Sequence, residues 1–354
     1  MAIISTGLQA SASLPRWFTP AAIVGSFSLA FAGFTLSSAA QQQAPSLVGV
    51  GLAGFAIYLA VTILISRLVE GRRKAADRLV TSLVTAAFAL AVIPLVSLAW
   101  TVISNGLARL DIAFFTNSMR NIVGPGGGAL HAIVGTLELT LIASLISVPV
   151  GIMTAIYLVE YGRGRLAKAV TFFVDVMTGI PSIVAGLFAF TLFLVLLGPA
   201  AAINGFAGAI ALSVLMIPVV VRATEEMLKI VPNELREASY ALGVPKWLTI
   251  VKVVIPTALA GIATGVIIAI ARVIGETAPL LLAAGFTTSM NYNPFADKMM
   301  TLPVFVFTSF ANQGIDAQSY LDRSWAGALT LMLIVMILNL VARLISKFFS
   351  PKGS

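Results

Sequence analysis

The chain has 354 residues, of which 59% are hydrophobic and 10% charged, with no cysteine, one histidine and a formal net charge of +8. Ordinary globular domains are about 45–50% apolar, so this composition indicates a polytopic membrane protein. The absence of cysteine excludes disulfides and thiolate sites, and a single histidine disfavours histidine-rich metal sites and Ser-His-Asp catalysis. We therefore expect no catalytic residue and no metal site in this chain.

Apolar runs long enough to cross a bilayer recur along the chain and predict an all-α fold with about eight transmembrane helices. The first run is counted as a span because the N-terminal stretch lacks the pattern of a signal peptide. The fifth and seventh runs are longer than a span needs, and we expect them to be tilted or broken. The predicted spans are residues 18–36, 47–66, 80–103, 132–158, 169–198, 204–221, 255–285 and 325–346.

The basic residues indicate how these spans are oriented. If the loop RLVEGRRKAADR (residues 67–78) is cytoplasmic, alternation of the spans puts both termini inside. Of the 22 basic residues, only Arg109, Arg120, Lys298 and Arg323 then fall outside, and Arg272 falls within a span. The positive charge therefore reflects the topology of the spans, and we expect contact with lipid but no nucleic-acid partner.

The same basic loop gives the predicted domain boundary. Residues 1–78 form an N-terminal helix pair with its loop, and residues 79–354 form the remaining domain of about six spans. The external segments 107–131 and 286–323 are long enough either to meet an extracytoplasmic partner or only to cap the bundle. The turn GPGGG (residues 124–128) is not a phosphate loop, because no Lys-Ser or Lys-Thr follows it. An ATP-driven process would therefore need an ATPase on another polypeptide.

A charged segment, ELREASYALGVPKWLTIVKVVIP, lies between the sixth and seventh predicted spans. Asn233 suits the N-cap of a helix, and Glu234 and Glu237 favour its first turn. Gly243 suits its C-terminal end, so the segment predicts a helix of about ten residues. Pro245 then begins a second short helix before Pro256 opens the seventh span. The segment thus predicts a helical hairpin at the cytoplasmic surface.

The first of these helices is amphipathic, because Leu235, Ala238 and Leu242 recur at helical spacing. It could rest among lipid headgroups, with Trp247 as an anchor. However, its acidic residues suit a protein partner better than an anionic lipid surface.

The spacing of this segment resembles the EAA motif of type I, binding-protein-dependent ABC importer permeases. That motif runs Glu-Ala-Ala, Gly, then Ile-x-Leu-Pro, and it is matched here by Glu237, Ala238, Ser239, Gly243 and residues 253–256. Ser239, Val253 and Ile255 are conservative departures. The resemblance implies a coupling helix at about 233–243 that docks into a groove of a separate ATPase subunit, through Glu234, Glu237, Ala238, Ser239, Leu242 and Gly243.

Ionisable residues within the spans are costly and count as candidates for function. Arg272 and Glu276 are four residues apart, which would place them on one helix face. The planar donors of arginine can bind an oxyanion. The glutamate could either hold the arginine in place or accept a proton from a protonated anion. The alternative is a buried structural ion pair. For Asp175 and Glu138 we favour structural roles, since both lie near the ends of their spans.

Three uncharged donors, Thr178, Ser182 and Thr277, stand beside residues that disrupt helices. Gly179 and Pro279 are two of these neighbours, and an opened backbone there could line a cavity. Serine and threonine within spans more often bond their own backbone. Despite this alternative, we predict that these three residues belong to the substrate path, together with Arg272 and Glu276.

Four segments resemble the A-type permeases of phosphate-uptake ABC importers (PstA): TGIPSIVAGLF, GETAPLLLAAG, AIVGTLELT and TLPVFVF. The C-type sister usually continues Gly-Glu-Thr with methionine. The resemblance covers about residues 79–349 and implies that Arg272 and Glu276 take part in phosphate passage. It also implies a second homologous permease (PstC-like), a dimer of ATPase subunits (PstB-like) that binds ATP and magnesium, and an extracytoplasmic phosphate-binding protein (PstS-like).

No cofactor is expected in this chain itself. Two alternatives remain open from the sequence. The first is a permease of the same architecture for another oxyanion such as sulfate or molybdate. The second is an ion-coupled secondary transporter that works without ATP.

Overall fold

The computed structural model describes residues 13–41 and 46–349, and within these ranges all of the regular structure is helical. Among the described residues, seven helices are long and apolar enough to cross a membrane, or up to eight if one bent pair counts as a span. The predicted all-α membrane fold is therefore confirmed. The chain divides into two compact units, Met1–Ala99 and Trp100–Ser354. The boundary expected between residues 78 and 79 stays a prediction.

The first unit contains a hairpin of α1 (Phe18–Gln41) and α2 (Leu47–Val69), followed by the beginning of α3 (Arg72–Gly106). The hairpin helices pack closely, because a Cβ added at Gly54 would lie 2.8 Å from the Phe27 ring. A side chain larger than hydrogen at this position would push the two helices apart.

The turn between α2 and α3 is held by an ion pair. Arg78 donates to both carboxylate oxygens of Glu70, at 2.6 and 2.9 Å. The same carboxylate accepts bonds from the Ser66 hydroxyl and the Leu14 backbone N–H. These bonds, led by that from Arg78, lower the pKa of Glu70 from 4.5 to about 2.

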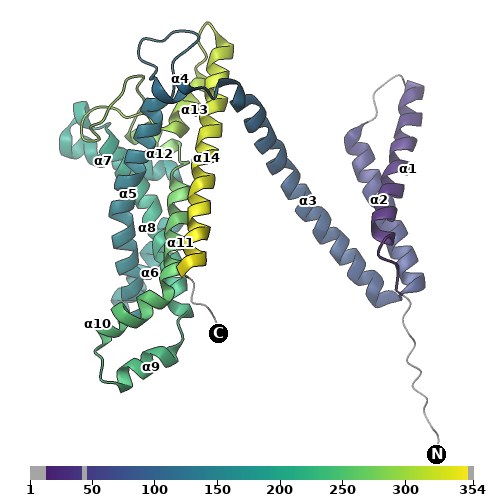
Figure 1. The fold of residues 1–354 in the computed structure, drawn as a ribbon, viewed down its shortest axis with the longest axis horizontal. Coiled ribbons are helices and arrows are strands. Elements are labelled where there is room, and N and C mark those ends of the chain that lie inside the picture. The colour runs from purple at the N-terminus through teal and green to yellow at the C-terminus, as the bar shows by residue number, and fades with distance from the viewer. Residues whose placement is uncertain (1–12, 42–45, 350–354) are drawn as a thin grey trace, which may run out of the picture. The chain divides into compact units, whose positions relative to one another are not determined.

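The second unit is a bundle whose long helices lie side by side (Figure 1): α5 (Leu130–Ile156), α8 (Gly205–Ile230), α11 (Ile255–Val273) and α14 (Ala317–Phe349). Glycine allows the closest approach, since a Cβ at Gly151 of α5 would lie 2.6 Å from Val220 of α8. The short helices α4 (Ile112–Thr116) and α13 (Leu302–Ala311) lie at one end of this bundle, and α9 (Asn233–Ala241) and α10 (Lys246–Thr249) lie at the other.

Both runs expected to be tilted or broken are broken. The helices α6 (Gly164–Thr178) and α7 (Ser182–Leu197) meet at an angle of 108°. The helix α11 ends at Val273, and α12 (Ala278–Ala283) begins after a short gap. Proline stands at the start of each second piece, as Pro181 and Pro279, and it cannot continue a regular helix from the preceding turn.

Several predicted boundaries are wrong, and two of them flank the charged segment. The sixth span does not end at residue 221, because α8 continues to Ile230. Its charged end stays helical through ion pairs of Glu225 with Arg222 and Lys229 one turn away on either side. The seventh span does not open at Pro256, because one helix runs from Lys246 to Val273.

Two short π-helical segments occur at the end of the bundle that carries α9. The segment η2 (Tyr157–Tyr161) extends α5, and η4 (Ile250–Val254) joins α10 to α11. The π-helical turn before Pro256 accommodates a residue without an N–H donor, so the helix passes through the proline without a break. Two 3₁₀ turns, η1 (Leu107–Arg109) and η3 (Pro199–Ala201), complete the described elements.

Candidate coupling surface and membrane charge site

The helix α9 ends as predicted but begins differently. Gly243 has a φ of +76°, and the backbone N–H groups of Gly243 and Val244 donate to Tyr240 and Ser239 at 2.9 and 3.2 Å. This left-handed stop confirms that Gly243 ends the helix, as predicted. The predicted N-cap is wrong, because Pro232 takes that position and Asn233 is the first helical residue. A proline in extended conformation can start a helix without a side-chain cap, which sequence preferences for asparagine do not reveal.

The apolar stripe of α9 points away from the protein. Leu235 is 41% exposed and Leu242 84% exposed, and Ala238 between them is exposed as well. The acids Glu234 and Glu237 beside the stripe are also exposed. A surface helix usually turns such a stripe toward the core of its own protein. Here the stripe is left for contact with something outside this chain.

Polar side chains form the inner face of α9. Ser239 is 8% exposed, and its hydroxyl lies 2.8 Å from that of Thr249 on α10. Arg236 donates to the Glu160 carboxylate of η2 at 2.8 Å. Lys246 of α10 donates to the backbone carbonyl of Glu160. Trp247 is 61% exposed, so the hairpin does not use it as an internal packing residue.

The predicted charge pair lies at the break between α11 and α12. Arg272 is in the last turn of α11 and is exposed, whereas Glu276 lies in the gap and is half-buried. The two residues therefore do not share a helix face, and that expectation is wrong because the helix stops at Val273. Neither side chain has an ion pair or hydrogen bond within residues 13–41 and 46–349.

The three predicted donors occupy the two helix breaks. Thr178 bonds its own helix, donating to the Val174 carbonyl at 2.8 Å. Ser182 is the first residue of α7 and is half-buried. Thr277 stands just before α12. The breaks are neighbours, because α7 packs on α12 so closely that a Cβ at Gly186 would lie 2.6 Å from Pro279.

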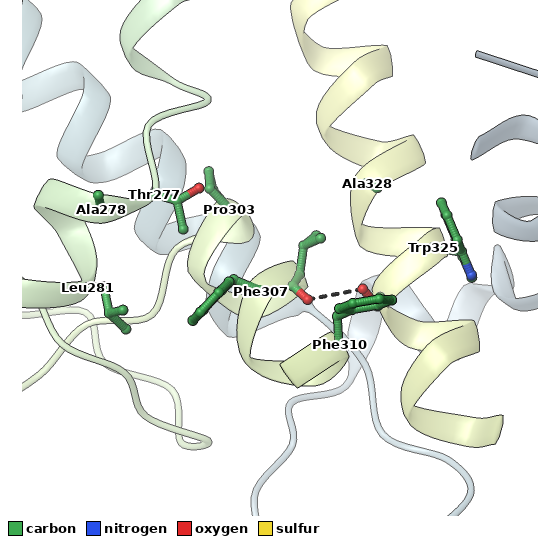
Figure 2. Close-up of a pocket in the computed structure, with 10 residues that line it drawn as sticks. Thr277, Ala278, Leu281, Pro303, Phe307, Phe310, Trp325 and Ala328 are labelled. Atoms are coloured by element: carbon green, nitrogen blue, oxygen red, sulfur yellow. Dashed lines mark hydrogen bonds between the residues drawn. The ribbon is translucent and has the colours of Figure 1, made fainter. Parts of the chain in front are cut away.

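Thr277 also borders a cavity of about 530 Å³ between α12, α13 and α14. Figure 2 shows Pro303 and Phe307 of α13 on one side of this cavity, with Trp325 and Ala328 of α14 on another. The lining is mostly apolar, and Arg272 and Glu276 do not belong to it. The structure thus brings Thr277 to the cavity without the two charged residues.

Other charges within the bundle differ in their surroundings. Asp175 forms an ion pair with Arg222 of α8, which agrees with the structural role favoured for it. Glu138 is half-buried and has no hydrogen bond or ion pair in the described part of the chain. Glu160 was not singled out from the sequence. The sequence gives little indication of its role, because its partner Arg236 lies 76 residues away.

A comparison with protein families matches residues 147–353 to the binding-protein-dependent transport system inner membrane component. The chain belongs to this family. The matched range includes both broken spans, α9 and α14, so the predicted membership is confirmed on the segments that carry it. The chain is therefore a multi-pass membrane protein and a permease component of a transport system.

Curated relatives extend the match over most of the permease. The phosphate transport system permease protein PstA 1 of Mycobacterium tuberculosis is 47% identical, over 77% of this chain and 90% of that protein. PstA of Mycobacterium leprae is 44% identical over 79% of this chain and 91% of that protein. PstA of Yersinia pestis is 39% identical over 77% and 90%. The resemblance to the PstA family that the motifs predicted is thus confirmed.

Proposed function

We propose that this permease is the PstA-type subunit of an ATP-driven importer that carries inorganic phosphate across the cytoplasmic membrane. The relatives named above support the choice of substrate. The proposal rests most on the position of Arg272. This cation lies at a helix break within a membrane-spanning segment and has no partner among the described residues. Such a residue costs free energy unless it meets an anion or water.

The break offers phosphate two kinds of contact. The guanidinium of Arg272 has planar donors that match two oxyanion oxygens. Glu276, four positions later and off the helix, can accept the proton that a hydrogen phosphate ion still carries. Backbone N–H groups at the start of α7 add partial positive charge beside the neighbouring break. Ser182 and Thr277 would supply neutral hydrogen-bond donors along the same path.

The partners follow from the same proposal. A second, homologous permease would complete the path, and an extracytoplasmic binding protein would deliver phosphate from outside. Two ATPase subunits with ATP and magnesium would lie inside, where the loops rich in basic residues place α9. The exposed stripe of Leu235, Ala238 and Leu242 would dock into them, with Glu234 and Glu237 at its edge.

The driving step would be a movement of α9. Closure of the ATPase dimer would draw α9 and the corresponding helix of the second permease together. Because α10 continues through η4 into α11 as one helix, that movement would reach the break that carries Arg272. The site at the break would then close toward the cytoplasm and open toward the outside.

The test is uptake by the assembled transporter in vesicles, with labelled phosphate and with sulfate or molybdate as competitors. We expect saturable phosphate uptake that requires ATP inside and the binding protein outside. Arg272→Gln should lower this uptake by about 10- to 100-fold while the complex still assembles. Inhibition by sulfate or molybdate as strong as that by unlabelled phosphate would overturn the choice of substrate.

A further inference from the structure

We propose that Glu160 and Arg236 are positioning residues that transmit the movement of α9 to α5 and α8. This inference rests on the proposed function, because it concerns how that transport would be driven. It assigns the transmission to one buried ion pair at the end of the bundle. The stripe of α9 would receive the movement, and this pair would pass it on.

The pair is placed where both charges depend on each other. Its side chains are only 5% exposed at Glu160 and 12% exposed at Arg236. Two guanidinium nitrogens approach one carboxylate oxygen, at 2.8 and 3.1 Å. An exposed ion pair contributes little, but removing one partner of a buried pair leaves an unpaired charge and is strongly unfavourable. The contact should therefore persist while α9 moves.

Arg236 also reaches the end of a second long helix. It donates to the backbone carbonyls of Leu228 and Val231 at 2.9 and 2.6 Å. These carbonyls belong to the last turn of α8 and to the residue that follows it. Carbonyls at a helix end have no partner within the helix, and a cation there is favoured by the helix dipole. One side chain thus connects α9 to the ends of both α5 and α8.

Glu160 is held by both arms of the hairpin. Its carboxylate accepts from Arg236 of α9, and its backbone carbonyl accepts from Lys246 of α10. The other buried contact of α9, between Ser239 and Thr249, stays within the hairpin. In the part of the chain that the structure describes, Arg236 is therefore the residue of α9 whose side chain forms hydrogen bonds to α8 and η2.

The helix segments at these contacts can change register. Glu160 lies in the π-helical turn η2, and the second arm enters the membrane through the π-helical turn η4. Such turns are rare and occur frequently at functional sites. A turn with one extra residue can relax to an α-helical turn by a small local shift, which gives the connection two discrete arrangements. The ion pair would select between them according to the position of α9.

The test uses the assembled transporter with Arg236→Gln and Glu160→Gln. The control is Arg163→Gln, which removes an exposed charge three residues from Glu160 that has no side-chain hydrogen bond or ion pair within residues 13–41 and 46–349. For each pair variant we expect uptake to fall by about tenfold or more, while ATP hydrolysis and co-purification of the ATPase stay within about twofold. Arg236→Lys, which keeps the charge but not the planar fork, should recover part of the uptake.

A second measurement does not depend on the substrate. The chain contains no cysteine, so spin labels can be placed only at Tyr240→Cys on α9 and Arg165→Cys on α6, both at exposed positions. With the native pair, the distance between the labels should keep one narrow distribution with and without nucleotide. With Arg236→Gln, the distribution should broaden or change when nucleotide binds.

The outcomes separate this inference from the proposed function. If the unaltered transporter does not take up phosphate, the proposed substrate is wrong, and the label distances still decide the role of the pair. The pair is a purely structural contact if uptake, hydrolysis and co-purification fall together. Unchanged label distances in Arg236→Gln, or full uptake by both pair variants, would equally overturn the inference.

Discussion

The end of the bundle that carries α9 and the break between α11 and α12 both hold charged residues, but they hold them differently. At α9, Arg236 and Glu160 are paired and largely buried. At the break, Arg272 is exposed, Glu276 is half-buried, and neither has a partner in the described chain. Within the residues that the structure describes, Arg236 and Glu160 neutralise each other, whereas Arg272 and Glu276 are left without a partner.

This difference indicates what each region is for. A charge that the chain neutralises itself serves to hold parts of the chain together. A charge kept in a membrane-spanning segment without a partner is unfavourable until something from outside the chain meets it. The paired region therefore suits the transfer of movement, and the unpaired region suits the binding of a mobile anion or a group of a second subunit.

The largest effect is expected from Arg272→Gln, which tests the unpaired region. Loss of charged hydrogen bonds worth about 1.5–3 kcal/mol should lower phosphate uptake by about 10- to 100-fold. Uptake should be measured in vesicles together with the amount of assembled complex. Equal losses of uptake and of assembly would show that Arg272 is part of a structural ion pair with a neighbouring subunit, and the contrast between the regions would disappear.

The next effect is expected from Glu237→Lys, which reverses a charge on the exposed edge of α9. The protein should insert normally, while uptake falls by about tenfold and ATP hydrolysis continues without it, because the docking surface is altered. Uptake and hydrolysis should be measured on the same preparation. Lys168→Glu, an exposed charge reversal on α6, is the control and should behave as the unaltered protein. Normal uptake by Glu237→Lys would refute the assignment of α9 as the coupling helix.

A smaller effect is expected from Gly243→Ala. The φ of +76° at Gly243 strains any residue with a Cβ, at a cost of about 1 kcal/mol. The hairpin should become less ordered, and uptake should fall about threefold to fivefold. Limited proteolysis within residues 241–247 would detect the change. Gly33→Ala, where an added Cβ meets nothing within 4 Å, is the control. Equal protection of both variants would mean that the left-handed stop is not needed.

The smallest effect on transport is expected from the ion pair of the first unit. The pKa of Glu70 is about 2 in the fold against an ordinary 4.5. Its ionised form is therefore stabilising, with the full contribution above about pH 4.5 and a progressive loss as the pH falls toward 2.

The backbone amides in the turn between α2 and α3 should consequently be equally protected from hydrogen exchange at pH 7 and pH 5, after correction for intrinsic rates. Glu70→Gln should lower that protection by about 1–2 kcal/mol and leave uptake within about twofold. Asp77→Asn, which neutralises an exposed acid nearby, serves as the control. A clear loss of protection between pH 7 and pH 5 in the unaltered protein would contradict the lowered pKa.

Local patterns were enough to predict several features of the site. The glycine stop at Gly243 depends on one residue type and its spacing, and the structure has it. The breaks at Pro181 and Pro279 follow from the chemistry of proline, which acts on its immediate neighbours. The N-cap at Asn233 and a separate helix before Pro256 were predicted wrongly. In both cases the local preference was overruled, by Pro232 at the cap and by a π-helical turn before the proline.

The sequence by itself determined that the chain is a multi-span helical permease, where its charges fall along the spans, and which short segment resembles a coupling helix. The length of an apolar run and the spacing of a motif depend on residues that are close together in the chain, so both can be identified from the sequence. Only the tertiary structure decided that Arg236 pairs with Glu160 across 76 residues and that Arg272 and Glu276 do not share a helix face. Charge pairing depends on distances of a few ångströms between helices, and those distances exist only once the bundle has packed.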